Sequence, residues 1–429
     1  ADSVAAPPAA PTPPTAPPPR RWPRWWLRLE RNAITTALLA PVFILLLGNL
    51  VQALWFLNGY AAANTHRPEW AFWDATRIVR GTINEFPFFT FLIADLHAHM
   101  IVMPFALAVV AVLVALVRRP LGLPVGAGVG MLVLLGWLIG TLRVTNTWDF
   151  PTFAALTLAT LLLLTWAALR RTLAQPSVDS AAWQVLRAGS LWLGQVVLVL
   201  GLSTLLFQPF FAHFATESSG VELLKEGGRS TFAEQVLFAE RTNLWDSLRL
   251  YGLWYFIFIS GGVVLAWRTR RGTIVSAWLR ESRVLPCVIG IVSGIGLWLG
   301  WLWLSSTGST PPEPAPDQLG GIGGWPALVL LLPLLGAALA LLWLLRDQHP
   351  RKLMPVLWGT LALGIIAGVE IVRVQGDIGR MNTVFKFGLH AWLLAGLTAA
   401  VTVAWLWRLG TAPRSPAVGT VDTPAPPKR

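Results

Sequence analysis

Charge is scarce in this chain. Only 13% of its 429 residues are Asp, Glu, Lys or Arg, whereas 55% are hydrophobic. Soluble domains usually carry about 25% charged residues, so the composition argues against a soluble all-α protein. The chain is predicted to be a membrane protein.

Cysteine and the signatures of soluble enzymes are also lacking. The single cysteine, Cys287, cannot form an intrachain disulfide. The sequence contains no phosphate loop, no Gly-x-Ser-x-Gly pattern and no His-Glu-x-x-His pattern. No cleavable signal peptide is recognisable and the chain starts with Ala, so we expect it to be cut from a longer protein.

Long apolar runs, in contrast, are abundant. A bilayer core of about 30 Å needs about 20 apolar residues per helix, and backbone groups in lipid must bond within their own helix. The sequence therefore predicts an all-α, polytopic transmembrane helix bundle of about 10 spans. The predicted spans are residues 33–57, 100–117, 124–142, 150–169, 188–207, 250–267, 284–305, 325–345, 353–372 and 387–407.

Basic residues are divided unevenly between the two sides of this bundle. The net charge of +12 at first suggests a nucleic-acid partner. With the first span running outward, however, 22 Lys and Arg lie inside and 11 outside, whereas 6 Asp and Glu lie inside and 15 outside. This positive-inside pattern predicts a multi-pass protein of the plasma membrane, surrounded by lipid, with both termini cytoplasmic and no nucleic-acid partner.

The chain divides into four predicted parts. Residues 1–19 are an Ala/Pro-rich, disordered linker. Residues 20–32 mix Trp and Arg in an interfacial segment. Residues 33–407 form the transmembrane domain, and residues 408–429 a disordered cytoplasmic tail. The predicted outer loops are residues 58–99, 143–149, 208–249, 306–324 and 373–386.

Two of these outer loops are expected to carry structure of their own. Residues 86–93 are aromatic and apolar, so they dip into the membrane or pack on the bundle, and Pro87 interrupts any helix there. Residues 208–249 are long enough to hold one or two outer amphipathic helices.

The first candidate site is Asp95-Leu-His97-Ala-His99, at the outer boundary of the second span. In an extended segment these three polar side chains project to one side. A carboxylate with two imidazoles can bind a divalent metal or transfer protons. Mn²⁺ or Zn²⁺ suits such ligands, and Mg²⁺ suits a carboxylate with phosphate. A polar cap over the loop backbone is the alternative.

Two further acidic residues border the outer loops. Glu85 is either a second carboxylate of the histidine site, or a helix cap or ion-pair partner of Arg77 or Arg80. Asp149 either binds substrate or caps the fourth span just before Pro151. Its neighbour, Trp148, is either an interface anchor or a platform for a sugar ring.

Residues 370–386 form the densest polar segment outside. Arginine forks and a lysine can hold a phosphate or pyrophosphate. The alternative is an outer loop that contacts lipid phosphates, but cations on the side that the positive-inside rule disfavours favour a functional role. The predicted substrate-binding residues here are Arg373, Asp377, Arg380, Asn382 and Lys386.

Three motifs within residues 33–407 resemble a family of large, uncharacterised prokaryotic membrane proteins, the YYY membrane protein family. The family is grouped with the C-type glycosyltransferase superfamily, which implies a C-type glycosyltransferase-like bundle with its active site on the outer face. The tyrosine triplet and the N-terminal spans of the family are missing, so the chain is expected to hold the C-terminal part of the module. The motifs are Glu85-Phe-Pro-Phe-Phe with Asp95-Leu-His97-x-His99, Asn146-Thr-Trp-Asp149-Phe-Pro151, and Arg380-Met-Asn-Thr-Val-Phe-Lys386-Phe followed by Ala391-Trp392.

The resemblance implies transfer of a sugar from a polyprenyl-phosphate donor at the outer membrane face. Asp95 and Glu85 are the predicted catalytic residues, and Asp95 with His97 and His99 the predicted ligands of a divalent metal, Mg²⁺ or Mn²⁺. The cations of the 370–386 segment would hold the donor phosphate. A transporter or flippase of an anionic lipid or polymer is the rival, and it predicts broken helices and charges at mid-membrane. A non-catalytic membrane assembly subunit is the third reading.

Overall fold

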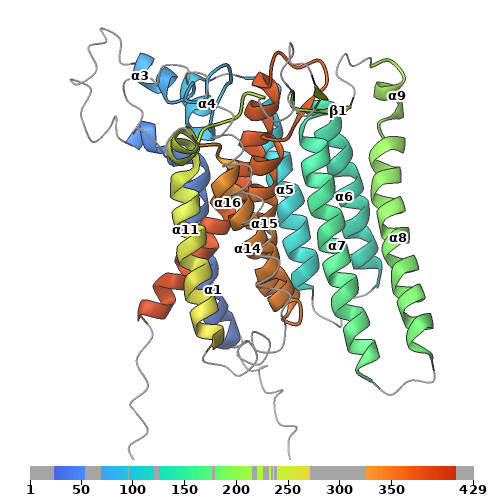
Figure 1. Cartoon of the computed structure of the whole chain (residues 1–429). Coiled ribbons are helices and arrows are strands. Elements are labelled where there is room, and N and C mark those ends of the chain that lie inside the picture. The colour runs from blue at the N-terminus through green and yellow to red at the C-terminus, as the bar shows by residue number, and fades with distance from the viewer. Residues whose placement is uncertain are drawn as a thin grey trace, which may run out of the picture.

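The computed structural model describes residues 24–53, 69–94, 96–119, 125–175, 179–214, 220–225, 231–232, 235, 239–270 and 325–411. The described part is a bundle of long helices with shorter elements gathered at one end (Figure 1). The predictions outside the described residues are the disordered residues 1–19 and most of the tail, the span 284–305, the loop 306–324, and Asp95.

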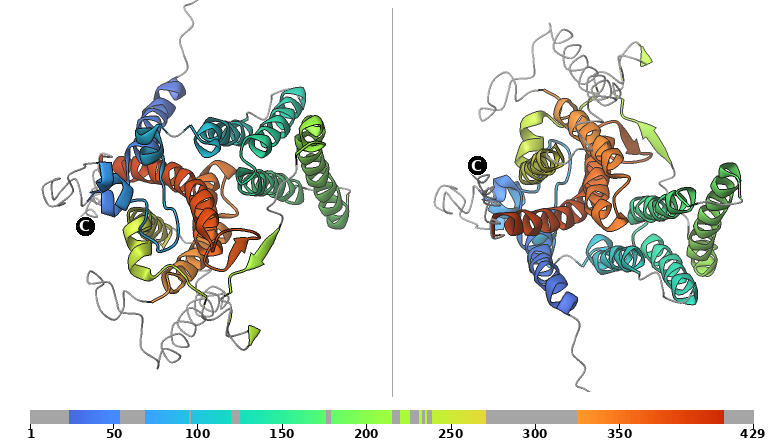
Figure 2. Two further views of the ribbon diagram at one scale, coloured as in Figure 1. Left: turned by 90° about the horizontal axis from the view of Figure 1, so that it is seen from above. Right: turned by 90° about the horizontal axis from the view of Figure 1, so that it is seen from below.

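The first group of helices follows four predicted apolar spans in sequence order. The first of them packs against the second. Figure 2 shows the four lying together on one side of the molecule. They are α5 (Ala98–Arg118), α6 (Val125–Thr145), α7 (Asp149–Leu173) and α8 (Ala181–Leu205).

The second group surrounds the longest helix, α16 (Met381–Thr411). Helix α16 packs against every other member of this group except α14, and it also contacts α7 of the first group. In both views of Figure 2 it lies between the two groups. The other members are α1 (Arg24–Pro41), the π-helix η1 (Val42–Leu46), α11 (Leu244–Arg270), α14 (Leu328–Leu345) and α15 (Pro350–Gly368).

Seven helices among the described residues are long and apolar enough to cross a membrane. They fall on seven of the predicted spans: α5, α6, α7, α8, α11, α14 and α16. The first predicted span contains only a shorter apolar helix, Ala33–Leu46, which ends in η1. The predicted span 353–372 falls on α15, a 19-residue helix that begins beside Arg351 and Lys352. A polytopic helical bundle is confirmed, and the figure of about 10 spans stays a prediction.

The shorter elements lie together at the upper end of the bundle in Figure 1. Strands β1 and β2 pair antiparallel, with Glu222 opposite Arg373. The 208–249 loop thus contributes a strand and a four-residue helix among its described residues, where amphipathic helices were predicted. The elements are α3 (Glu69–Asp74), α4 (Pro87–Ile93), α9 (Gln208–Phe211), β1 (Val221–Leu223) and β2 (Val372–Val374).

Helix α4 corrects the prediction that Pro87 interrupts a helix. Pro87 is the first residue of α4, where its missing N–H costs nothing because the first helical N–H groups have no intrahelical partner. The helix ends at Ala94, whose φ of 55° is left-handed. Residues 86–93 therefore pack on the bundle as a short helix with Phe86 and Phe89 buried.

An aromatic cluster joins α4, α11, η1 and α16 in the core. Trp392 of α16 stacks on Phe86 with ring centroids 5.4 Å apart and meets the edge of Trp254 at 5.0 Å. Trp254 in turn contacts Phe43 of η1 at 5.9 Å. Burial of these large rings fixes the upper part of α16, from which the polar side chains of the next section project.

Candidate functional site

The start of α16 is held by a carboxylate. Asp377 accepts hydrogen bonds from the backbone N–H groups of Asn382 and Thr383, at 3.1 and 2.7 Å, and from both of their side chains. Gly376 and Gly379 take left-handed φ values of 83° and 61°, which glycine adopts without a Cβ penalty. The Asp377 carboxylate therefore caps the first turn of the helix.

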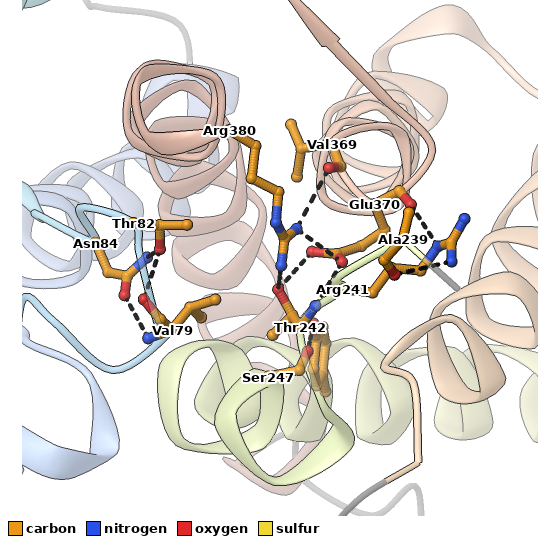
Figure 3. A network of polar contacts seen from close by, with 11 residues as sticks. Val79, Thr82, Asn84, Ala239, Arg241, Thr242, Ser247, Val369, Glu370 and Arg380 are labelled. Carbon is orange, nitrogen blue, oxygen red and sulfur yellow. Dashed lines mark hydrogen bonds and ion pairs between the residues drawn. The ribbon is translucent and has the colours of Figure 1, made fainter. Parts of the chain in front are cut away.

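A buried ion pair lies beneath this turn (Figure 3). Arg380 Nη1 lies 2.8 Å from Glu370 Oε2, and their side chains are only 6% and 4% exposed. The Thr242 hydroxyl donates to Glu370 Oε1 at 2.6 Å, and its backbone N–H donates to Glu370 Oε2 at 2.8 Å. This network joins the start of α16 to the end of α15 and the start of α11. Removing one partner of such a pair would leave an unpaired buried charge, which is strongly destabilising.

Arg241 extends the network toward the surface. Its Nε donates to the Glu370 carbonyl oxygen at 2.9 Å, and its Nη1 donates to the Ala239 carbonyl (Figure 3). Burial lowers the pKa of the Arg241 guanidinium, and the Glu370 carboxylate opposes that shift. The guanidinium thus holds two loop carbonyls in place.

Arg373 bridges the two-stranded ribbon. Its Nε donates to Glu222 Oε1 of the facing strand at 2.7 Å, and its Nη1 donates to the Gly379 carbonyl at 2.8 Å. Arg373 and Arg380, both predicted to bind phosphate, are therefore each engaged with a carboxylate of this chain.

Lys386 has different surroundings. Its Nζ lies 3.1 Å from His99 Nδ1, and it sits 4.2 Å from the centre of the Phe385 ring. His99 Nε2 lies 3.8 Å from Glu85 Oε2, with side-chain exposures of 3% and 12%. The His97 ring stacks on that of His99 at 5.5 Å. The structure thus brings the predicted residues Glu85, His97, His99 and Lys386 into one acid–base cluster near the first turns of α5 and α16.

Hydrogen bonds among its own residues hold the loop before Glu85 in place (Figure 3). The Asn84 side chain accepts from the Val79 N–H at 2.8 Å and donates to Thr82 Oγ1 at 3.0 Å. Glu85 also faces Arg77, whose pKa is lowered by burial and raised by the Glu85 carboxylate. Glu85 thus lies near both His99 and Arg77, and its role as a second carboxylate stays a prediction.

A second buried pair lies deeper on α16. His390 Nε2 is 3.2 Å from Asp149 Oδ2, and its Nδ1 is 3.1 Å from Thr152 Oγ1. Asn146 Nδ2 also donates to Asp149 Oδ2. The prediction that Asp149 caps α7 is wrong: Trp148 occupies the cap position without a side-chain bond, and the carboxylate turns inward to His390. Trp148 itself contacts Phe387 edge-on at 6.0 Å.

The described residues supply no further ligand for the predicted metal ion. Among the described residues no three His, Cys, Asp or Glu form a group that could hold a metal ion. Both ring nitrogens of His99 face protein groups, and the nearest to Nδ1 is an ammonium, which disfavours a cation there. The prediction rests on His97 and on Asp95, which lies outside the described residues.

Sequence reasoning missed some of the residues that complete these clusters. Thr242 and Glu222 are far in sequence from their partners, with 128 residues separating Thr242 from Glu370 and 151 separating Glu222 from Arg373. His390 did leave a signal, since it follows Lys386 by one helical turn and so shares its helix face.

Residues 22–395 match a family described as uncharacterized membrane protein, DUF2298. The chain belongs to this family. The polar clusters described above lie within the matched region, and so do the motifs that indicated an uncharacterised membrane protein family. No curated protein and no solved structure matches the chain. Membership in the DUF2298 family establishes a membrane protein and leaves its chemistry to be argued from the clusters.

Proposed function

We propose that this DUF2298 protein is a membrane glycosyltransferase of the C-type class, which moves a sugar from a polyprenyl-phosphate donor to an acceptor at the outer face. The observation that supports the proposal is the cluster of Glu85, His99 and Lys386. It places a carboxylate, an imidazole and an ammonium together at the outer ends of two apolar helices. A lipid-linked phosphate would present its anionic group at this level of the membrane.

The proposed step is a displacement at the anomeric carbon. The acceptor oxygen bonds to that carbon while the bond from the carbon to the donor phosphate oxygen breaks. The acceptor proton passes to a carboxylate, and the electron pair of the broken bond leaves on the phosphate. A positioned base and a cation beside the leaving group each lower the barrier of such a step.

The cluster and its neighbour in sequence supply both functions. Asp95, which precedes His97 by two residues in the sequence, is the proposed base, and Glu85 is the second carboxylate. Lys386 is the proposed phosphate cation, since its ammonium faces an imidazole. A divalent metal, Mg²⁺ or Mn²⁺, at Asp95 and His97 stays a secondary proposal.

The other predicted binding residues take positioning roles in this proposal. Asp377 and Asn382 fix the first turn of α16, and Arg380 fastens it to Glu370. Arg373 closes the ribbon beside it. Each contact helps to set the position of Lys386, which follows these four residues in the sequence. Trp148 and Asp149 line the neighbouring helix end, where Trp148 can offer a ring face to a sugar.

Transfer assays on the full-length protein in lipid nanodiscs test the proposal. Polyprenyl-phosphate sugars are supplied as donors, with EDTA and with added Mg²⁺ to test the metal. Asp95→Asn is expected to lower transfer about 10²- to 10⁴-fold, and Lys386→Gln about 10²- to 10³-fold, without a change in thermal stability. Lys225→Gln is the matched control, because Lys225 is an exposed lysine of the same end and should leave transfer unchanged.

Two outcomes would contradict the proposal. One is wild-type turnover in Asp95→Asn, and the other is absence of transfer from every donor by the wild-type protein. A transporter or flippase is the second candidate, because the first helix breaks into η1 and then places Asn49 and Gln52, 1% and 2% exposed, in the bundle. Movement of labelled lipid across the bilayer without any sugar transfer would favour it.

A further inference from the structure

The end of the bundle opposite the candidate site collects basic side chains from three helices. Arg118 ends α5, Arg171 lies in the last turn of α7, and Arg351 and Lys352 open α15. All four are exposed. Helix α15 packs against both α5 and α7. These four residues are the inner basic surface.

Hydrogen bonds hold these helix ends together. Arg351 Nη2 donates to the Arg118 carbonyl at 3.0 Å, which ties the start of α15 to the end of α5. Arg170, next to Arg171, donates to the Arg346 carbonyl at 3.2 Å and so ties α7 to the same corner. The positive-inside rule explains why basic residues lie on this side, but it does not require them to meet.

The electrostatics of His349 report the same convergence. Its Nδ1 accepts a hydrogen bond from the Arg351 N–H at the start of α15. Partial burial lowers the pKa of this imidazole, and three neighbouring cations lower it further. Those cations are Arg351, Arg171 and Lys352. One acidic side chain, Asp347, is paired here, and it is already 2.7 Å from Arg170.

The surface lies at the level of a membrane boundary. The Arg346 guanidinium lies over the Trp343 ring, 4.3 Å from its centroid, and Trp343 is 55% exposed. Trp166, one turn before Arg170 on α7, is 40% exposed, and Leu339 is 52% exposed. Exposed tryptophans beside arginines, with exposed leucines further along the same helices, are the pattern of headgroup and acyl-chain levels.

We propose that the inner basic surface binds the headgroup phosphate of an anionic phospholipid, with the acyl chains lying along the exposed apolar sides of α7 and α14. Charge complementarity supports this occupant, because exposed cations of three helix ends that contact one another lie at one corner of the bundle. The adjoining apolar side chains favour a lipid over a soluble anion. Basic pockets between helices at the cytoplasmic side bind lipid headgroups in this manner.

The test compares two double variants of equal charge. Arg171→Gln with Lys352→Gln removes two cations of the surface. Arg187→Gln with Arg408→Gln removes two from the same end, on α8 and at the end of α16. The full-length protein in neutral detergent micelles is titrated with phosphatidylglycerol, and bound lipid is counted by native mass spectrometry. We expect half-saturation to need roughly 25-fold more lipid in the first variant, and a wild-type value in the second.

Further arms separate the alternatives. Arg171→Lys with Lys352→Arg, which keeps both charges, should retain binding and so shows that loss is not misfolding. Equal weakening in the two double variants would overturn the proposal, since it would mean diffuse attraction to anionic lipid. Competition by inorganic phosphate as effective as by phosphatidylglycerol would also overturn it, because the site would then take a free anion.

Discussion

Helices α8 and α16 are both apolar enough to cross a membrane, yet they occupy opposite places in the bundle. Only 6% of the apolar window of α8 is buried inside the protein, against 67% for α16. Apolarity therefore marks a helix for the membrane without saying whether it faces lipid or other helices. In a bilayer the hydrophobic effect does not sort helices, so close packing decides.

Small residues account for the central place of α16. Ala391, Ala395, Ala399 and Ala400 are fully buried, and they let neighbouring backbones approach. Helix α8, in contrast, carries large exposed side chains, among them Leu193 at 56% exposure. Three pairs of substitutions sharpen this comparison, each with one member on either helix.

The largest difference is expected for tryptophan. Trp392→Ala on α16 removes a ring that is 2% exposed and stacked on Phe86, so it should lower the free energy of unfolding by about 3–5 kcal/mol. Trp183→Ala on α8 removes a ring that is 53% exposed and should change it by less than about 0.5 kcal/mol. Unfolding in detergent micelles measures both. Similar losses would show that α8 is covered by a partner.

Replacing a glycine with alanine should change the stability in opposite directions on the two helices. A Cβ at Gly396 of α16 would come within 2.9 Å of the Ile44 side chain and 3.4 Å of backbone atoms of η1, so Gly396→Ala should destabilise by about 1–3 kcal/mol. A Cβ at Gly194 of α8 meets nothing within 4 Å, so Gly194→Ala should stabilise by about 0.5–1 kcal/mol. Thermal midpoints that move in the same direction would contradict the assignment of these two faces.

Helix caps should give the smallest difference. Asp377→Ala removes an acceptor of two backbone N–H groups at the start of α16 and should cost about 1–2 kcal/mol. Ser180→Ala on α8 removes a single bond from the Trp183 N–H at 3.2 Å and should cost about 0.5–1 kcal/mol. The comparison uses the same unfolding measurement, and a larger loss in the serine variant would be the contrary result.

Sequence predicted the spans and the side on which polar residues gather, because apolar length and charge placement are local properties. It also predicted Glu85, the two histidines and Lys386 as candidate site residues. The structure brings these four residues together. It could not predict contacts such as Thr152 with His390, separated by 238 residues. The inward turn of Asp149 and the β1–β2 ribbon depend on such distant partners, so the local capping signal misjudged Asp149 and no local signal indicated the ribbon.

Side-chain contacts join the two helix groups at both ends of the bundle. At the end that carries the candidate site, Lys386 meets His99 and His390 meets Asp149, joining α16 to α5 and α7. At the opposite end, Arg351 holds the carboxyl end of α5, and Arg170 holds the residue after α14. A transporter that works by rocking one helix group against the other would have to break both sets of contacts in each cycle. The two helix groups should therefore keep a fixed position relative to each other.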